Sequence, residues 1–151
     1  MDNEKQIIKG LEPIKLFLVD DDVVFLKSLE IDFLYSADFS IETFATGELC
    51  MASLNHCPDV IILDYFLDGI EMNAMNGIET LDRIKSYNPD IPVIILSSQD
   101  KIDVAIDCMH HRAYDYVVKS ETAFIRLQKI ITSIFHYKKM EKELNWYMER
   151  M

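Results

Sequence analysis

The chain has 151 residues, half of them apolar, which suits a domain with a hydrophobic core and argues against intrinsic disorder. Its formal net charge is -11, and so acidic a surface disfavours direct binding to nucleic acid or to an anionic membrane. The apolar runs are too short to span a membrane, and the three cysteines contain no CxxC pair, as is typical of reduced thiols in a cytoplasmic protein.

Apolar and polar segments alternate along the chain in a pattern that predicts five strands and five helices. Residues 1–12 are polar and are expected to form a flexible arm. The expected strands are Ile14–Val19, Phe39–Phe44, Val60–Leu63, Val93–Leu96 and Tyr114–Val118. The expected helices are Val23–Tyr35, Gly47–Asn55, Gly77–Tyr87, Lys101–His111 and a last one that begins near Glu121.

The central strands are apolar at almost every position, with the sequences IKLFLV, VIIL and VIIL. Such continuous runs are typical of parallel strands that are covered on both faces. Strands that alternate with helices of this length predict a doubly wound α/β fold with a five-stranded parallel sheet.

Polar side chains follow four of these strands directly. They are Asp20, Asp21 and Asp22 after the first strand, Asp64 after the third, Ser97 and Ser98 after the fourth, and Lys119 after the fifth. Ligands of open α/β sheets bind at this edge, beyond the carboxyl ends of the strands. A single aspartate in this position is more often a helix cap, which is the role we expect for Asp22, but four strands with such residues at one edge indicate a site.

The chemistry of these residues is coherent. Clustered carboxylates repel one another unless a cation or a proton lies between them, and oxygen ligands of this kind suit Mg²⁺. A carboxylate can also act as a nucleophile that accepts a phosphoryl group. Phosphoryl transfer needs positive charge and hydrogen-bond donors around the transferred oxygens, and Lys119 and Ser97 are residues of the right types.

Four motifs, FLVDDD, ILDYFLDG, VIILSS and AYDYVVKS, occur in an order and at a spacing that resemble the receiver domain of bacterial response regulators. The resemblance covers the chain from Ile14 to the middle of the last helix. It implies a flavodoxin-like sheet of strand order 2-1-3-4-5 in a two-component signalling protein. The expected partner is a sensor histidine kinase or a histidine phosphotransfer protein, and no separate enzymatic turnover is expected.

The resemblance also implies a role for individual residues. Asp64 would be the phosphoacceptor, and Mg²⁺ would be held by Asp20, Asp21, Asp64 and the backbone carbonyl of Phe66. Lys119 would pair with the phosphoryl group. Ser97 and Tyr116 would form the switch that reports phosphorylation to a partner-binding face.

The sequence departs from the family pattern at three places. Ser98 replaces the usual alanine beside the switch hydroxyl, and we expect this change to have little effect. The segment Asp64–Gly77 is about five residues longer than usual, and its Asp68 and Glu71 are expected to lie in a solvated loop. Ser120 stands where a proline usually follows the lysine, so we expect a trans peptide bond there.

Two other functions compete with this interpretation. Phosphatases of the haloacid-dehalogenase type also use an aspartate nucleophile and Mg²⁺. Their signature motif is DxD, with a second aspartate two residues after the nucleophile. Phe66 occupies that position here and cannot act as a general acid. A receiver-like interaction module that never takes up phosphate generally loses one of the acidic, acceptor or lysine residues, and all are present here.

The last helix is expected to continue beyond the receiver fold, which gives an arm at residues 1–12, a receiver domain at 13–136 and a helical extension at 137–151. Apolar residues at alternating steps of three and four predict a heptad seam with one charged break: Leu127, Ile130, Ile134, Tyr137, Glu141, Leu144, Met148 and Met151. The segment before Tyr137 is expected to be core. The exposed remainder is expected to pair two subunits as a homodimer, or to carry the switch signal to an output domain, or to be a frayed end.

Overall fold

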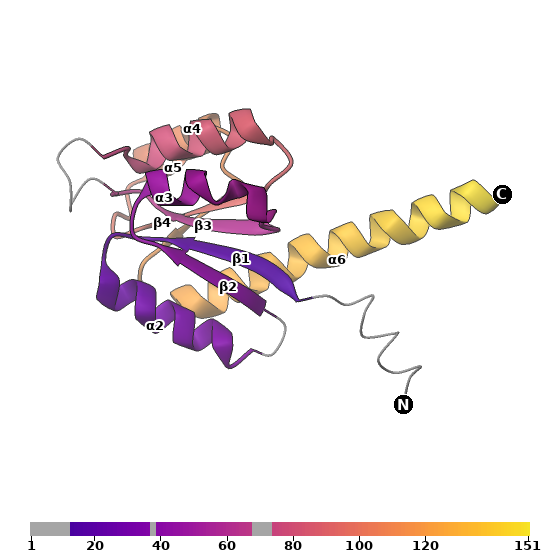
Figure 1. Cartoon of the computed structure of the whole chain (residues 1–151), viewed down its shortest axis with the longest axis horizontal. Helices are drawn as coiled ribbons and strands as arrows, with labels where there is room; N and C mark the ends of the chain where they lie inside the picture. Colours follow the sequence, from indigo (N-terminus) through magenta and orange to yellow (C-terminus); the bar gives the residue numbers. More distant parts are fainter. Residues whose placement is uncertain (1–12, 37–38, 68–73) are drawn as a thin grey trace. The chain divides into compact units, whose positions relative to one another are not determined.

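The structure is a computed structural model that describes residues 13–36, 39–67 and 74–151. The chain divides into two compact units, Met1–Lys119 and Ser120–Met151. The first unit contains a five-stranded sheet (Figure 1). Its strands are β1 (Ile14–Val19), β2 (Phe39–Phe44), β3 (Val60–Asp64), β4 (Val93–Ser97) and β5 (Asp115–Val118).

All neighbouring strands run parallel in the order β2-β1-β3-β4-β5, which confirms the predicted fold and strand order. The register places Val19 beside Leu63 and Asp64 beside Leu96. The carboxyl ends of β1, β3 and β4 therefore meet at one edge of the sheet. This alignment positions the residues that follow these strands close to one another.

Four α-helices of the first unit cover the sheet, and α2 lies on the opposite face from α3, α4 and α5 (Figure 1). They are α2 (Val23–Leu34), α3 (Gly47–Ala52), α4 (Gly77–Tyr87) and α5 (Ile102–His110). The predicted helix Gly47–Asn55 is shorter than expected, because a 3-10 turn, η1 (Leu54–His56), follows α3. The helices are thus close to their predicted places, with differences at the ends.

The strands contribute alternate side chains to the two faces of the sheet. Phe17, Ile61 and Ile95 belong to one cluster of buried residues with Leu81 of α4 and Cys108 of α5. On α2, Leu29 and Phe33 are buried, and the ring of Phe33 packs edge-on against Phe39 of β2. Because β3 and β4 are buried at every position, the sheet edge that they form is held rigidly.

Side-chain caps fix two helix starts near this edge. Asp22 accepts hydrogen bonds from the amides of Val24 and Phe25, which confirms its predicted role as the cap of α2. Asn76 caps α4 by accepting a hydrogen bond from the amide of Glu79 at 2.9 Å. Next to it, Gly77 lies so close to the chain that an added Cβ would come within 2.6 Å of the carbonyl oxygens of Asp64 and Tyr65.

The second unit contains one long helix, α6 (Ala123–Arg150). Its buried residues are Ala123, Leu127, Ile131 and Ile134, and every residue from Lys139 onward is exposed. Within the described residues, no helix is long and apolar enough to cross a membrane. The predicted extension of the last helix is present, whereas the predicted domain boundary between residues 136 and 137 stays a prediction.

Candidate functional site

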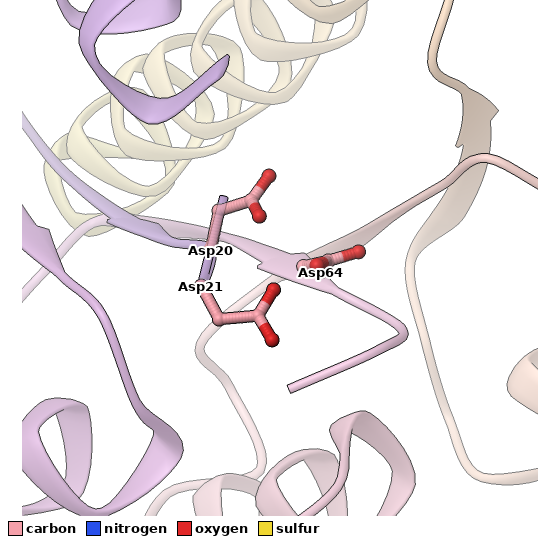
Figure 2. Close-up of side chains that lie close together, drawn as sticks. All are labelled: Asp20, Asp21 and Asp64. Carbon is pink, nitrogen blue, oxygen red and sulfur yellow. The ribbon is translucent and has the colours of Figure 1, made fainter. Parts of the chain in front are cut away.

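Three aspartates meet at the carboxyl edge of the sheet. Asp20 and Asp21 follow β1, and Asp64 is the last residue of β3 (Figure 2). One carboxylate oxygen from each residue lies within 4.8 Å of the others. Asp20 and Asp64 are each only 3% exposed, and Asp21 is partly exposed. The structure therefore brings together the three acidic residues that the sequence predicted at this site.

Lys119, directly after β5, reaches into the same cluster. Its Nζ lies 2.8 Å from Oδ2 of Asp20 and 3.5 Å from Oδ1 of Asp64. The ammonium group also lies over the ring of Phe25, 4.7 Å from the ring centre. An aromatic face at this distance attracts a cation, so Phe25 helps to hold Lys119 over the carboxylates.

The electrostatics of the cluster follow from burial and crowding. The pKa of Asp64 is raised from 3.8 to about 8, first by burial and then by the charge of Asp20, while Lys119 partly opposes this rise. Burial lowers the pKa of Lys119, but its contacts with Asp20 and Asp64 more than offset this effect, so the net shift is upward. Lys119 therefore offsets the repulsion among the carboxylates only in part, and in the absence of a metal the cluster relieves the rest by holding a proton on Asp64.

The residues present fit a divalent cation. Oδ2 of Asp20 is fully buried, and the ammonium group of Lys119, 2.8 Å away, is the charge that pairs with it. A buried carboxylate oxygen is costly and is well placed to become a metal ligand. Three carboxylates and no nitrogen or sulfur ligand make up the cluster, which is the donor set that Mg²⁺ prefers.

Ser97, Gln99 and Tyr116 form a hydrogen-bonded chain beside the aspartates. The Oγ of Ser97, which is fully buried, accepts a hydrogen bond from the amide of Gln99 at 3.1 Å. The hydroxyl of Tyr116 donates a hydrogen bond to the carbonyl oxygen of Gln99. The predicted switch pair is therefore linked through the backbone of Gln99, which the sequence did not indicate.

The segment after Asp64 is anchored at both ends. At its start, the amide of Phe66 donates to Oδ1 of Asp64 at 3.3 Å. At its end, the amide of Met75 donates to Oε1 of Glu48 on α3 at 2.5 Å. The amide of Gly77 also donates to the carbonyl oxygen of Tyr65 at 3.1 Å. These bonds position the backbone on both sides of the long loop.

Three sequence predictions concern this loop and the turn after Lys119. Asp68 and Glu71 lie outside the described residues. Phe66 follows Asp64 by two residues; it is 41% exposed, and its ring packs edge-on against Tyr65. No cis peptide bond occurs in the described ranges, so the expected trans bond between Lys119 and Ser120 is confirmed.

Comparison with known proteins identifies the family. The sequence model of the response regulator receiver domain family matches residues 16–132. This match covers most of the chain and includes Asp20, Asp21, Asp64 and Lys119. The chain belongs to the response regulator receiver domain family. Acceptance of a phosphoryl group on an aspartate is the function of this family, so the resemblance seen in the four sequence motifs is confirmed at the level of family and fold.

The receiver domain is similar to parts of longer regulators. It is 40% identical over 120 residues to a protein-glutamate methylesterase/protein-glutamine glutaminase of Clostridium acetobutylicum, covering 76% of this chain and 33% of that protein. It is 30% identical over 100 residues to the luminescence regulatory protein LuxO of Vibrio campbellii, covering 66% of this chain and 21% of that protein. The chain thus spans a third or less of these two relatives.

A solved receiver structure is also similar. The CheX-CheY-BeF3-Mg²⁺ complex of Borrelia burgdorferi matches with a TM-score of 0.71 and 26% identity, over 82% of this chain and 90% of that one. That complex contains Mg²⁺ and BeF3. The likeness covers most of this chain, so the receiver fold is shown by both sequence and structure.

The raised pKa of Asp64 predicts a pH dependence of stability in the metal-free receiver domain. Between pH 3.8 and about 8 the folded state holds a proton on Asp64 that the unfolded state has lost. The contribution of this group to stability therefore falls as the pH rises through that window, by at most about 1.4 kcal/mol per pH unit. Asp64→Asn should flatten the pH dependence of the free energy of unfolding, measured by urea denaturation in EDTA.

Asp32→Asn, on an exposed position of α2, is the matched control and should keep the wild-type pH dependence. An Asp64→Asn variant whose stability falls with pH as steeply as that of the wild type would contradict the assignment of the raised pKa to Asp64.

Proposed function

We propose that this receiver domain accepts a phosphoryl group on Asp64 and uses it to change a surface that a partner protein reads. The observation that carries the proposal is the convergence of Asp20, Asp21, Asp64 and Lys119 at one rigid edge of the sheet. Asp64 is the best candidate for the acceptor, because it ends the central buried strand and lies within reach of the lysine.

In the proposed reaction, a carboxylate oxygen of Asp64 forms a bond to phosphorus while the bond from phosphorus to the donor breaks. The leaving group of the donor departs with that electron pair and takes up a proton from solvent. Lys119, already 3.5 Å from Asp64, compensates the charge on the phosphoryl oxygens, and the Ser97 hydroxyl is expected to donate a hydrogen bond to one of them.

Asp20, Asp21, Asp64 and the carbonyl of Phe66 are the residues that we propose hold Mg²⁺. The cation would supply positive charge that keeps the carboxylates ionised and that compensates the incoming phosphoryl group. This matters for Asp64 because a carboxyl group with a pKa of about 8 is mostly protonated, and so not nucleophilic, at neutral pH.

The partners follow from the family and remain proposals. A sensor histidine kinase or a histidine phosphotransfer protein is the expected phosphodonor, which places the protein in the cytoplasm. We expect no separate substrate turnover and no direct binding of nucleic acid or membrane, in line with the net charge of -11. A second copy of this chain is a further expected partner, through α6.

The acceptor assignment predicts the outcome of a labelling experiment. Incubation with a small phosphodonor and Mg²⁺ should add one phosphoryl group, detected by intact-mass spectrometry, and Asp64→Asn should abolish the addition. Asp22→Asn is the control, because Asp22 lies beside the cluster but caps α2 instead of joining it. Normal labelling of Asp64→Asn would show that another residue is the acceptor. A wild-type protein that never labels would favour a phosphate-independent interaction module.

The link between Ser97 and Tyr116 provides the proposed switch. A phosphoryl group that draws the Ser97 hydroxyl toward Asp64 breaks the hydrogen bond from the Gln99 amide, and Gln99 holds the hydroxyl of Tyr116. A change at the phosphorylation site can therefore reach β5 and α5 through one short segment of backbone, as bistable switches require.

This switch predicts how far a phosphate mimic perturbs the NMR spectrum. In the wild-type protein, beryllofluoride with Mg²⁺ should shift the amide signals of Gln99 and Tyr116. In Ser97→Ala the mimic should still bind, but the shifts should stay near Asp64. Ser98→Ala is the matched control, because its side chain is exposed and should leave the wild-type response intact. Equal shifts at Tyr116 in Ser97→Ala would contradict this path.

A further inference from the structure

The second half of α6 exposes an unusual amount of apolar surface. Tyr137 is 77% exposed, Leu144 is 60% exposed and Tyr147 is 61% exposed. Met140 and Met151 are exposed as well. Isolated helices of this length are marginal in water, and an exposed apolar stripe usually marks a surface that another molecule covers.

These five residues lie on one face of the helix. Tyr137, Met140, Leu144, Tyr147 and Met151 follow one another at steps of three, four, three and four, which is the heptad spacing of a helix-pairing seam. We call this set the tail seam. At 3.6 residues per turn, its centre lies roughly 120° around the helix from the buried stripe Leu127, Ile131 and Ile134. The tail seam is therefore a separate face, not a continuation of the core.

The tail seam differs from the seam that the sequence suggested. Leu127 and Ile134 of that earlier pattern are buried in the structure and are unavailable to a partner. The earlier pattern also passes through Glu141, whereas the tail seam contains no charged residue. In the exposed part of α6, the tail seam is preferred to that pattern because it passes through Met140 and not through Glu141.

We propose that the tail seam pairs with the tail seam of a second copy of this chain. The charges beside it favour an antiparallel arrangement with Leu144 opposite Tyr147 of the second copy. In that register, the flanking positions bring Glu143 of each copy beside Arg150 of the other. Moving the helices by one heptad would place Glu143 beside Glu143, which like-charge repulsion disfavours. The parallel arrangement leaves Glu143 beside Met148, without a charge partner.

The size of the seam sets the expected strength of the pair. Two heptads are fewer than the three or four that a free-standing coiled coil usually needs, and the interface falls near the lower limit of about 1,000 Å² for specific association. However, α6 is already helical, so pairing does not have to nucleate a helix. The expected result is a weak, reversible dimer that forms in the micromolar range or above.

The proposal is tested with the full chain by sedimentation velocity over a wide concentration range, without a phosphodonor. The wild-type protein should shift from monomer to dimer as its concentration rises. Leu144→Glu, in the centre of the seam, should raise the dimer dissociation constant by about tenfold or more. Asn145→Glu adds the same charge one residue away, off the seam, and should change it by less than about threefold.

Circular dichroism of each variant separates a lost interface from a lost helix, since the helical content of Leu144→Glu and Asn145→Glu should match. Arg150→Glu alone should weaken the dimer about two- to fivefold, and Glu143→Arg with Arg150→Glu should restore it, because the two charges simply exchange places. A wild-type protein that stays monomeric at the highest concentration, or equal effects of Leu144→Glu and Asn145→Glu, would overturn the proposal. A double variant that remains weak would overturn the antiparallel register.

Discussion

Mutual repulsion among three carboxylates is the constraint on which the site depends. The parallel sheet brings Asp20, Asp21 and Asp64 together within 4.8 Å, and burial makes their charges costly. Lys119 supplies a positive charge to this cluster; its ammonium group contacts Asp20 and lies over the ring of Phe25. The remaining imbalance makes the site ready for a divalent cation and for a phosphoryl group whose oxygens need a positive partner.

The surrounding structure keeps this strained cluster in place. Buried strands fix the backbone of Asp64, and the close approach of Gly77 holds the start of α4 against the same strand end. Glu48 of α3 fixes the far end of the loop through Met75. The site thus combines a rigid sheet edge with one segment that can change conformation, the hydrogen-bonded chain from Ser97 through Gln99 to Tyr116. A local change in charge can move that segment without disturbing the sheet.

Sequence reasoning predicted the fold and the cluster because both follow from simple patterns. Continuous apolar runs predicted the parallel strands, and the edge of a parallel sheet had to gather Asp20, Asp21, Asp64 and Lys119. It could not predict the contact of Lys119 with Phe25 or the bond from Met75 to Glu48, because these depend on side-chain conformations and on loop closure between distant segments. The seam predicted from sequence followed the apolar spacing from Leu127 onward, and this start set it in the phase that passes through Glu141.

The most direct test of the central claim is the thermal stability of Asp21→Asn with and without Mg²⁺, measured by calorimetry. If repulsion among the carboxylates dominates, this variant should be more stable than the wild type in the absence of metal, by about 1 kcal/mol. It should also gain less stability from Mg²⁺, because one ligand is lost and binding stabilises only by mass action. A variant that melts lower than the wild type without metal would contradict the account.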